Sequence, residues 1–80
     1  MVGIQNTLIG GLAGDALTTG NSNIALGYSA LSADTAGDRS TAIGFQTLAN
    51  QNFTSNTDTY NTAVGYNAGV AVTTGTVNTL

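Results

Sequence analysis

Very few residues of this chain could carry acid–base chemistry. Its 80 residues include no His, Cys, Lys or Glu, and the net charge is −3. The charged side chains are Asp15, Asp34, Asp38, Arg39 and Asp58. Ser-His-Asp and Cys-His relays and Schiff-base lysines are therefore excluded.

A pair of aspartates is the remaining route to catalysis. Asp34 and Asp38, or carboxylates of neighbouring chains, could in principle hydrolyse a glycoside. Asp is also common in turns, where its carboxylate accepts local hydrogen bonds. We favour the turn interpretation, because the four Asp fall at different phases of the repeat described below. The sequence therefore predicts no catalytic residue and a protein that is not an enzyme.

Metal and cofactor sites find little support. The stretch GGLAGDA at Gly10–Ala16 approaches the calcium-binding pattern Gly-Gly-x-Gly-x-Asp, but its spacing is shifted by one place and it occurs once. Without Cys there is no disulfide framework and no thiolate zinc site. Asp38 beside Arg39 predicts an exposed ion pair of small energetic value. We predict no metal and no cofactor.

The charge pattern also excludes two classes of partner. A single cationic side chain offers no basic patch for nucleic acid or for anionic lipid. Gly interrupts every apolar stretch, so no segment is long enough to span a bilayer. We predict no nucleic-acid binding and no membrane insertion.

Three aromatic residues share one repeat position. Tyr28, Phe45 and Tyr66 recur at the spacing of the repeat itself. Such a position predicts a ladder of rings, one per copy. The ladder could stack sugars or bases, but a structural role is the preferred interpretation, because the first copy has Gly11 at this position.

The longest copy contains the best candidate for a receptor contact. Its extra residues fall within NQNFTSNTDTY, residues 50–60, and recognition in repeat proteins often lies in such insertions. Asn52, Phe53 and Tyr60 are the candidate contacts to a host glycan or surface protein. The alternative is a bulge whose rings pack back onto the fold, and both interpretations stay open.

These residues are positioned by an internal repeat. With Asn6 as position 1, further copies begin at Asn23, Ser40, Asn61 and Asn78, so the steps along the chain are 17, 17, 21 and 17. Self-similarity at a short period predicts stacked units that cannot bury their apolar faces alone. We expect one repeat domain over residues 1–80, with copies 6–22, 23–39, 40–60 and 61–77 and partial copies 1–5 and 78–80.

Each copy predicts two short strands and no helix. Positions 2 to 4 form the first strand, and Gly at position 5 turns the chain. The second strand is expected near positions 8 to 12, for example at 30–33 and 68–72. Gly at position 15 is expected to end the copy in a turn with positive φ. The prediction is an all-β chain of about four coils, a β-solenoid.

The strand alternation predicts which side chains face neighbouring chains. Position 4 is always Ile, Leu or Val, so we expect it inside each coil, together with position 2. Position 3 is then outside, where small residues allow close approach of another chain. So thin a coil buries little area, which predicts side-by-side homo-oligomers, most simply trimers. The predicted inter-chain contacts are Leu8, Ala25, Ala42 and Ala63.

Three stretches resemble a known repeat: NIALGYSA at Asn23–Ala30, STAIGFQT at Ser40–Thr47 and NTAVGYNA at Asn61–Ala68. They are similar to the head repeats of YadA-like trimeric autotransporter adhesins, and closer still to NTAIGYNA arrays of phage tail fibres and bacterial surface proteins. The resemblance implies a trimeric left-handed β-roll with a shaft or adhesive role. It also implies that Ala25, Ala42 and Ala63 lie toward neighbouring chains.

The sequence thus predicts a stiff trimeric spacer of a tail fibre or surface adhesin, located on a virion or cell surface, with receptor contact at residues 50–60. Alternatives are a filament subunit that stacks end to end, an ice-binding solenoid and a polysaccharide-degrading enzyme. Ice binding ranks low because the Thr residues at position 2 are expected to point inward.

Overall fold

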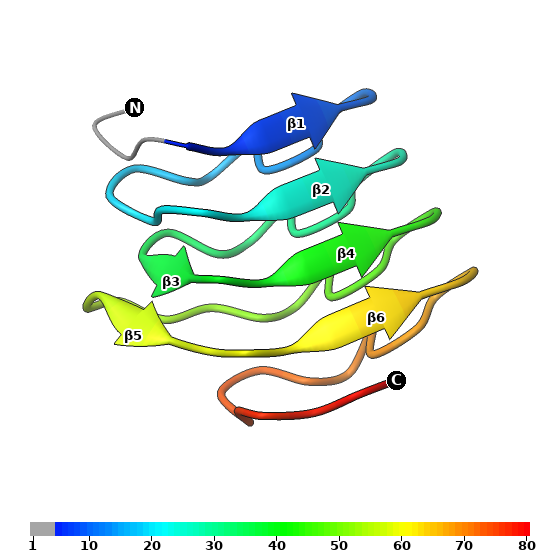
Figure 1. Cartoon of the computed structure of the whole chain (residues 1–80). Coiled ribbons are helices and arrows are strands. Elements are labelled where there is room, and N and C mark those ends of the chain that lie inside the picture. The colour runs from blue at the N-terminus through cyan, green and yellow to red at the C-terminus, as the bar shows by residue number, and fades with distance from the viewer. Residues whose placement is uncertain (1–4) are drawn as a thin grey trace.

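A computed structural model describes residues 5–80, and within that range it contains strands and turns but no helix (Figure 1). The all-β prediction is confirmed. It follows that no helix of residues 5–80 is suited to crossing a membrane. The six strands are β1 (Thr7–Ile9), β2 (Ile24–Leu26), β3 (Gly37–Asp38), β4 (Thr41–Ile43), β5 (Thr57–Asp58) and β6 (Thr62–Val64). The partial copy predicted at 1–5 lies outside the described residues, except for Gln5.

The main sheet pairs equivalent positions of successive copies. Its strand order is β1-β2-β4-β6, and every pair is parallel. Leu8 pairs with Ala25, Ala25 with Ala42, and Ala42 with Ala63. A further bridge joins Thr62 to Thr79. Successive copies therefore lie side by side in parallel register, and we call each copy a rung.

The second strand predicted within each copy does not form. Residues 30–33 and 68–71 lie in runs of turns instead, as do the matching segments of the other copies. Positions 7 and 9 of every copy have positive φ, for example 58° at Ser29 and 56° at Leu31, and such residues cannot continue a strand. These turn segments nevertheless stack, because Leu31 N donates to Thr47 O at 2.9 Å and Leu48 N donates to Ala68 O at 3.0 Å.

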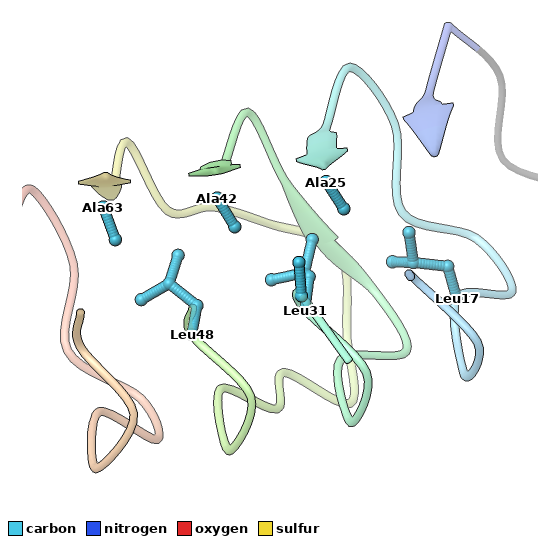
Figure 2. Packing of buried hydrophobic residues seen from close by; sticks show 7 residues of the cluster. Leu17, Ala25, Leu31, Ala42, Leu48 and Ala63 are labelled. Atoms are coloured by element: carbon cyan, nitrogen blue, oxygen red, sulfur yellow. The ribbon is translucent and has the colours of Figure 1, made fainter. Parts of the chain in front are cut away.

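The predicted orientation of the strands is wrong. Ala25, Ala42 and Ala63 have no exposed surface, whereas position 4 faces outward, with Ile9 57% and Val64 58% exposed. Figure 2 shows the alanines pointing from the main sheet toward leucines of the opposite layer. Those leucines, Leu17, Leu31 and Leu48, are buried and leave room for only a methyl group on the strand.

In the interior, the size of the strand residue at position 3 is complementary to the size of the turn residue at position 9. Copies two and three combine Ala25 with Leu31 and Ala42 with Leu48. The first copy reverses the sizes: a Cβ on Gly14 would lie 2.6 Å from Leu8 Cδ2. Close packing of this kind explains why Leu8 can replace Ala at position 3.

Two series of Gly serve different purposes. Gly10, Gly27, Gly44 and Gly65 at position 5 have φ between 120° and 129°, which suits glycine alone. Gly20 and Gly37 at position 15 do not have positive φ, so that prediction is wrong. They provide space instead, since a Cβ on Gly20 would lie 2.5 Å from Gly37 O.

Candidate functional site

Asp34 and Asp38, the pair considered above for catalysis, lie in different environments. Asp34 is fully buried, and Asp38 is 9% exposed. Asp34 Oδ1 accepts hydrogen bonds from Gly37 N at 3.1 Å and Phe53 N at 2.9 Å, and Oδ2 accepts one from Gln51 Nε2 at 2.7 Å. The bond from Gly37 N is the local turn contact that the sequence predicts. With its oxygens occupied and shielded from solvent, this carboxylate has a structural environment.

Asp38 and Arg39 do not form the predicted ion pair. Asp38 Oδ1 accepts a hydrogen bond from Asn21 N at 2.7 Å, and the Arg39 guanidinium pairs with Asp58. Backbone alternation explains the difference, because Asp38 turns inward while Arg39 turns outward. Within residues 5–80 no three acidic, His or Cys side chains gather where they could hold a metal ion.

A buried polar ladder runs through the stack. Asn6, Asn23 and Asn61 at position 1 each donate from Nδ2 to the Gly carbonyl at position 15 of the same copy, at 2.7 to 2.9 Å. Their Oδ1 atoms accept from the first backbone N of the next copy, at 2.9 to 3.0 Å. The sequence signal for this ladder is the recurrence of Asn at position 1. The strand prediction did not take it into account.

In the third copy, other polar side chains take the place of the missing Asn of the ladder. Ser40 replaces Asn at position 1 and is too short to reach a carbonyl at position 15. Thr59 contacts Ser40 through its hydroxyl, while Gln51 Nε2 donates to Ser40 Oγ at 2.9 Å. Asn61 Nδ2 in turn donates to Gln51 Oε1 at 2.7 Å. The polar residues at position 12, Asp34 and Gln51, thus replace the apolar Leu17 of the first copy.

The residues predicted to contact a receptor are divided by the structure. Phe53 is 9% exposed and packs into the fold, so it is not available to a partner. Tyr60 is 53% exposed, and Asn52 is also exposed. The alternative interpretation, in which rings pack back onto the fold, therefore holds for Phe53 and not for Tyr60.

The insertion enters the long copy at two places. Ala36 N donates to Phe53 O, which keeps the ordinary repeat offset of 17. The β3–β5 pair joins Gly37 to Thr57 with an offset of 20, and the β4–β6 pair joins Thr41 to Thr62 with an offset of 21. The first insertion therefore precedes β5, at 54–56, and a further residue is added between β5 and β6. The second insertion is a bulge that places Asp58 and Tyr60 outward around the buried Thr59.

The outer side of the main sheet is apolar at position 4. Ile9, Leu26 and Val64 at position 4 are 57%, 40% and 58% exposed, and Ile43 between them is partly exposed. The predicted ladder of rings forms at the end of these strands: Tyr28 and Phe45 have centroids 5.5 Å apart, and Phe45 and Tyr66 have centroids 5.3 Å apart. The interplanar angles are 18° and 8°, so the rings cover one another's faces. We define the outer face as Ile9, Leu26, Ile43, Val64, Tyr28, Phe45 and Tyr66.

The predicted inter-chain contacts lie elsewhere. Ala25, Ala42 and Ala63 are completely covered by their own chain, and Leu8 is half-buried against the same core. Their side chains cannot reach a neighbouring chain. The choice was wrong because both sides of the strands are apolar, and the larger residues were expected inside.

Comparison with known proteins found no match: no family model, no curated protein and no solved structure matches the chain.

Proposed function

We propose that the chain is a β-solenoid of about four rungs that serves as a stiff segment of a tail fibre or surface adhesin, on a virion or cell surface. The proposal rests on the repeat resemblance and on the stacked copies. Parallel backbone hydrogen bonds join the successive copies along the main sheet, and this continuous pairing makes the backbone stiff. In this role the chain is a spacer with a receptor contact.

The outer face is the observation that supports side-by-side assembly. Four aliphatic side chains in one row and three rings beside them carry no charge, and large exposed apolar patches of this kind mark interaction surfaces. Identical chains arranged around a rotation axis would cover the row in every copy at once. We assign the inter-chain contact to the outer face and propose a homotrimer with a left-handed coil.

The mass in solution tests this assembly. Light scattering coupled to gel filtration should give about three times the chain mass of 8.0 kDa. The double variant Leu26→Asp/Ile43→Asp should give the mass of one chain, because carboxylates at these positions would be buried without partners. Thr74→Asp, at an exposed corner, is the matched control and should leave the mass unchanged. A wild-type chain that is folded by circular dichroism and has the mass of a monomer would refute the proposal.

A second candidate, ice binding, gains support from the corrected strand orientation. At position 2, Thr7, Thr62 and Thr79 are exposed, and Thr41 is partly exposed. Ile24 separates Thr7 from the others, so the continuous row consists of Thr41, Thr62 and Thr79, on neighbouring segments about 4.8 Å apart. Thermal hysteresis of the wild type and of Thr62→Leu tests this function. Absence of hysteresis in the wild type at millimolar concentration would dismiss it.

A further inference from the structure

Three exposed side chains of the second and third rungs form a compact polar group. Backbone alternation turns Asp58 and Tyr60 outward on either side of the buried Thr59, and it turns Arg39 outward between the buried Asp38 and Ser40. The Arg39 and Asp58 side chains are 53% and 45% exposed and form an ion pair. We call Arg39, Asp58 and Tyr60 the ridge; it precedes the main-sheet strands, at the end opposite the ladder of rings.

The backbone beneath the ridge is fixed by three rungs. β3 and β5 lie side by side (Figure 1), with Thr59 N donating to Asp38 O at 2.9 Å. From the fourth rung, Val77 N donates to Thr59 O at 2.6 Å. The ridge residues are thus presented by a preorganised surface, which lowers the entropic cost of binding.

Two of the ridge residues, Arg39 and Tyr60, have a left-handed backbone conformation that other residue types adopt more easily. Arg39 has a φ of 60° and Tyr60 a φ of 51°, a region that Gly, Asn and Asp tolerate best. The equivalent residues Gln5, Ser22 and Val77 have φ from 56° to 63°. The fold therefore dictates the backbone at this position, and none of these side chains is Gly or Asn. The side chain at this position is therefore free to vary between copies without changing the backbone that presents it.

The chemistry of the ridge indicates its ligand. Asp58 neutralises Arg39, so the ridge carries no net charge, yet the guanidinium keeps free N–H donors and the carboxylate keeps acceptor capacity. Sugar hydroxyls both donate and accept hydrogen bonds, and the apolar face of a pyranose can stack on the half-exposed Tyr60 ring. The three side chains are exposed side by side on successive rungs, so a chain of sugar units could contact them together.

We propose that Arg39, Asp58 and Tyr60 bind a neutral glycan chain. The inference deepens the proposed adhesive function and rests on it, since it names the contact residues and the ligand class. It needs only one chain and does not depend on the outer face. Phe53 does not belong to the contact, because it is buried.

Saturation-transfer NMR with three neutral hexasaccharides, cellohexaose, maltohexaose and mannohexaose, tests the site. At least one should receive saturation from the wild type. Tyr60→Ala and Arg39→Gln should each weaken binding of that sugar by about tenfold or more, the scale typical of Tyr and Arg contacts. Leu12→Ala removes an exposed large side chain outside both the ridge and the outer face, of accessibility similar to Tyr60 (50% and 53%), and should leave binding unchanged.

Three results would overturn the site. They are no transfer to any of the three hexasaccharides, equal weakening by Leu12→Ala and Tyr60→Ala, or binding that Arg39→Gln and Tyr60→Ala leave intact. Circular dichroism of each variant identifies loss of fold, and for a variant that unfolds, Tyr60→Ser or Arg39→Ser replaces it, because Ser22 occupies the equivalent position with the same backbone conformation. Light scattering of the same samples separates the two proposals, because a wild type with the mass of a trimer but without glycan binding rejects the ridge alone.

Discussion

Asp34 and Gln51 occupy a repeat position that is apolar in the first and last copies. Leu17 and Val72 are their equivalents, and all four point into the stack. A buried carboxylate is tolerated only where hydrogen-bond donors compensate for the lost water. For Asp34 the donors are Gly37 N, Phe53 N and Gln51 Nε2. The middle rungs therefore depend on their neighbours for more than apolar contact.

The position 5 glycines allow backbone strain and steric clash to be measured separately. A Cβ on Gly27 would lie 2.6 Å from Gly44 O, whereas a Cβ on Gly65 would meet nothing within 4 Å. Both residues have positive φ, 129° and 122°. Gly65→Ala should lower the free energy of unfolding by about 1–3 kcal/mol through strain alone.

Gly27→Ala should be more destabilising, because the backbone of the next rung must also move. Urea unfolding followed by circular dichroism measures both variants. Equal losses would show that the clash is relieved without cost, and Gly11→Ala, with ordinary φ and contact only to the Tyr28 ring, is the control.

At this scale the sequence predicted the ladder of rings and the need for Gly at position 5. It could not show that Phe53 is buried and Tyr60 exposed, since both lie among similar polar residues. The structure distinguishes them, because Phe53 takes the repeat position of the buried Ala36 and Tyr60 takes that of the exposed Arg39.

Between elements, the sheet and the turn layer share one narrow interior. A large residue on one side requires a small one on the other, as Leu8 with Gly14 and Ala25 with Leu31 show. The two residues of each pair belong to the same copy and meet across the interior, so they should be energetically coupled.

Exchanging one such pair tests the coupling. Ala25→Leu should destabilise by about 1–3 kcal/mol through overpacking, and Leu31→Gly by at least about 2 kcal/mol through lost burial. The double variant reproduces the Leu8–Gly14 arrangement and should be more stable than the sum of the single effects predicts, by about 1 kcal/mol or more. Strict additivity in a urea-unfolding cycle would contradict the shared interior.

Strand positions were predictable, but their orientation was not. The first strand of every copy forms where the pattern places it, at positions 2 to 4. Apolar residues occupy both of its sides, so hydrophobicity alone favoured the larger side chains at position 4 as the core. The width of the interior decides the matter, and that width depends on Leu17, Leu31 and Leu48 in the turn layer, where strands had been expected.

For the whole molecule, repeat copies are similar in backbone but not interchangeable. Doubling residues 6–22 would stack Leu17 on a second Leu17, and doubling residues 23–39 would stack Asp34 on a second Asp34. The two added segments are equal in length. They differ in whether the extra rung places two buried carboxylates about 4.8 Å apart.

The first duplication should therefore fold with a thermal midpoint no lower than that of the wild type. The second should unfold at a lower temperature, because like charges repel in the interior and one of them lacks Gln51 as a donor. Thermal unfolding followed by circular dichroism compares them, and Asp34→Asn in the added copy should restore part of the loss. Identical midpoints for the two duplications would disprove the dependence of each rung on its neighbour.

The parallel pairing of successive copies also determines how the molecule responds to force. Within residues 5–80, backbone hydrogen bonds join each rung only to the rungs above and below it, so we expect a load applied at the ends to peel copies away one at a time instead of shearing the sheet at once. At full extension of the backbone, a released copy of the ordinary length spans about 61 Å at most, and the longer copy 40–60 spans about 76 Å. The molecule would thus dissipate tension in discrete lengths, with one step longer than the others.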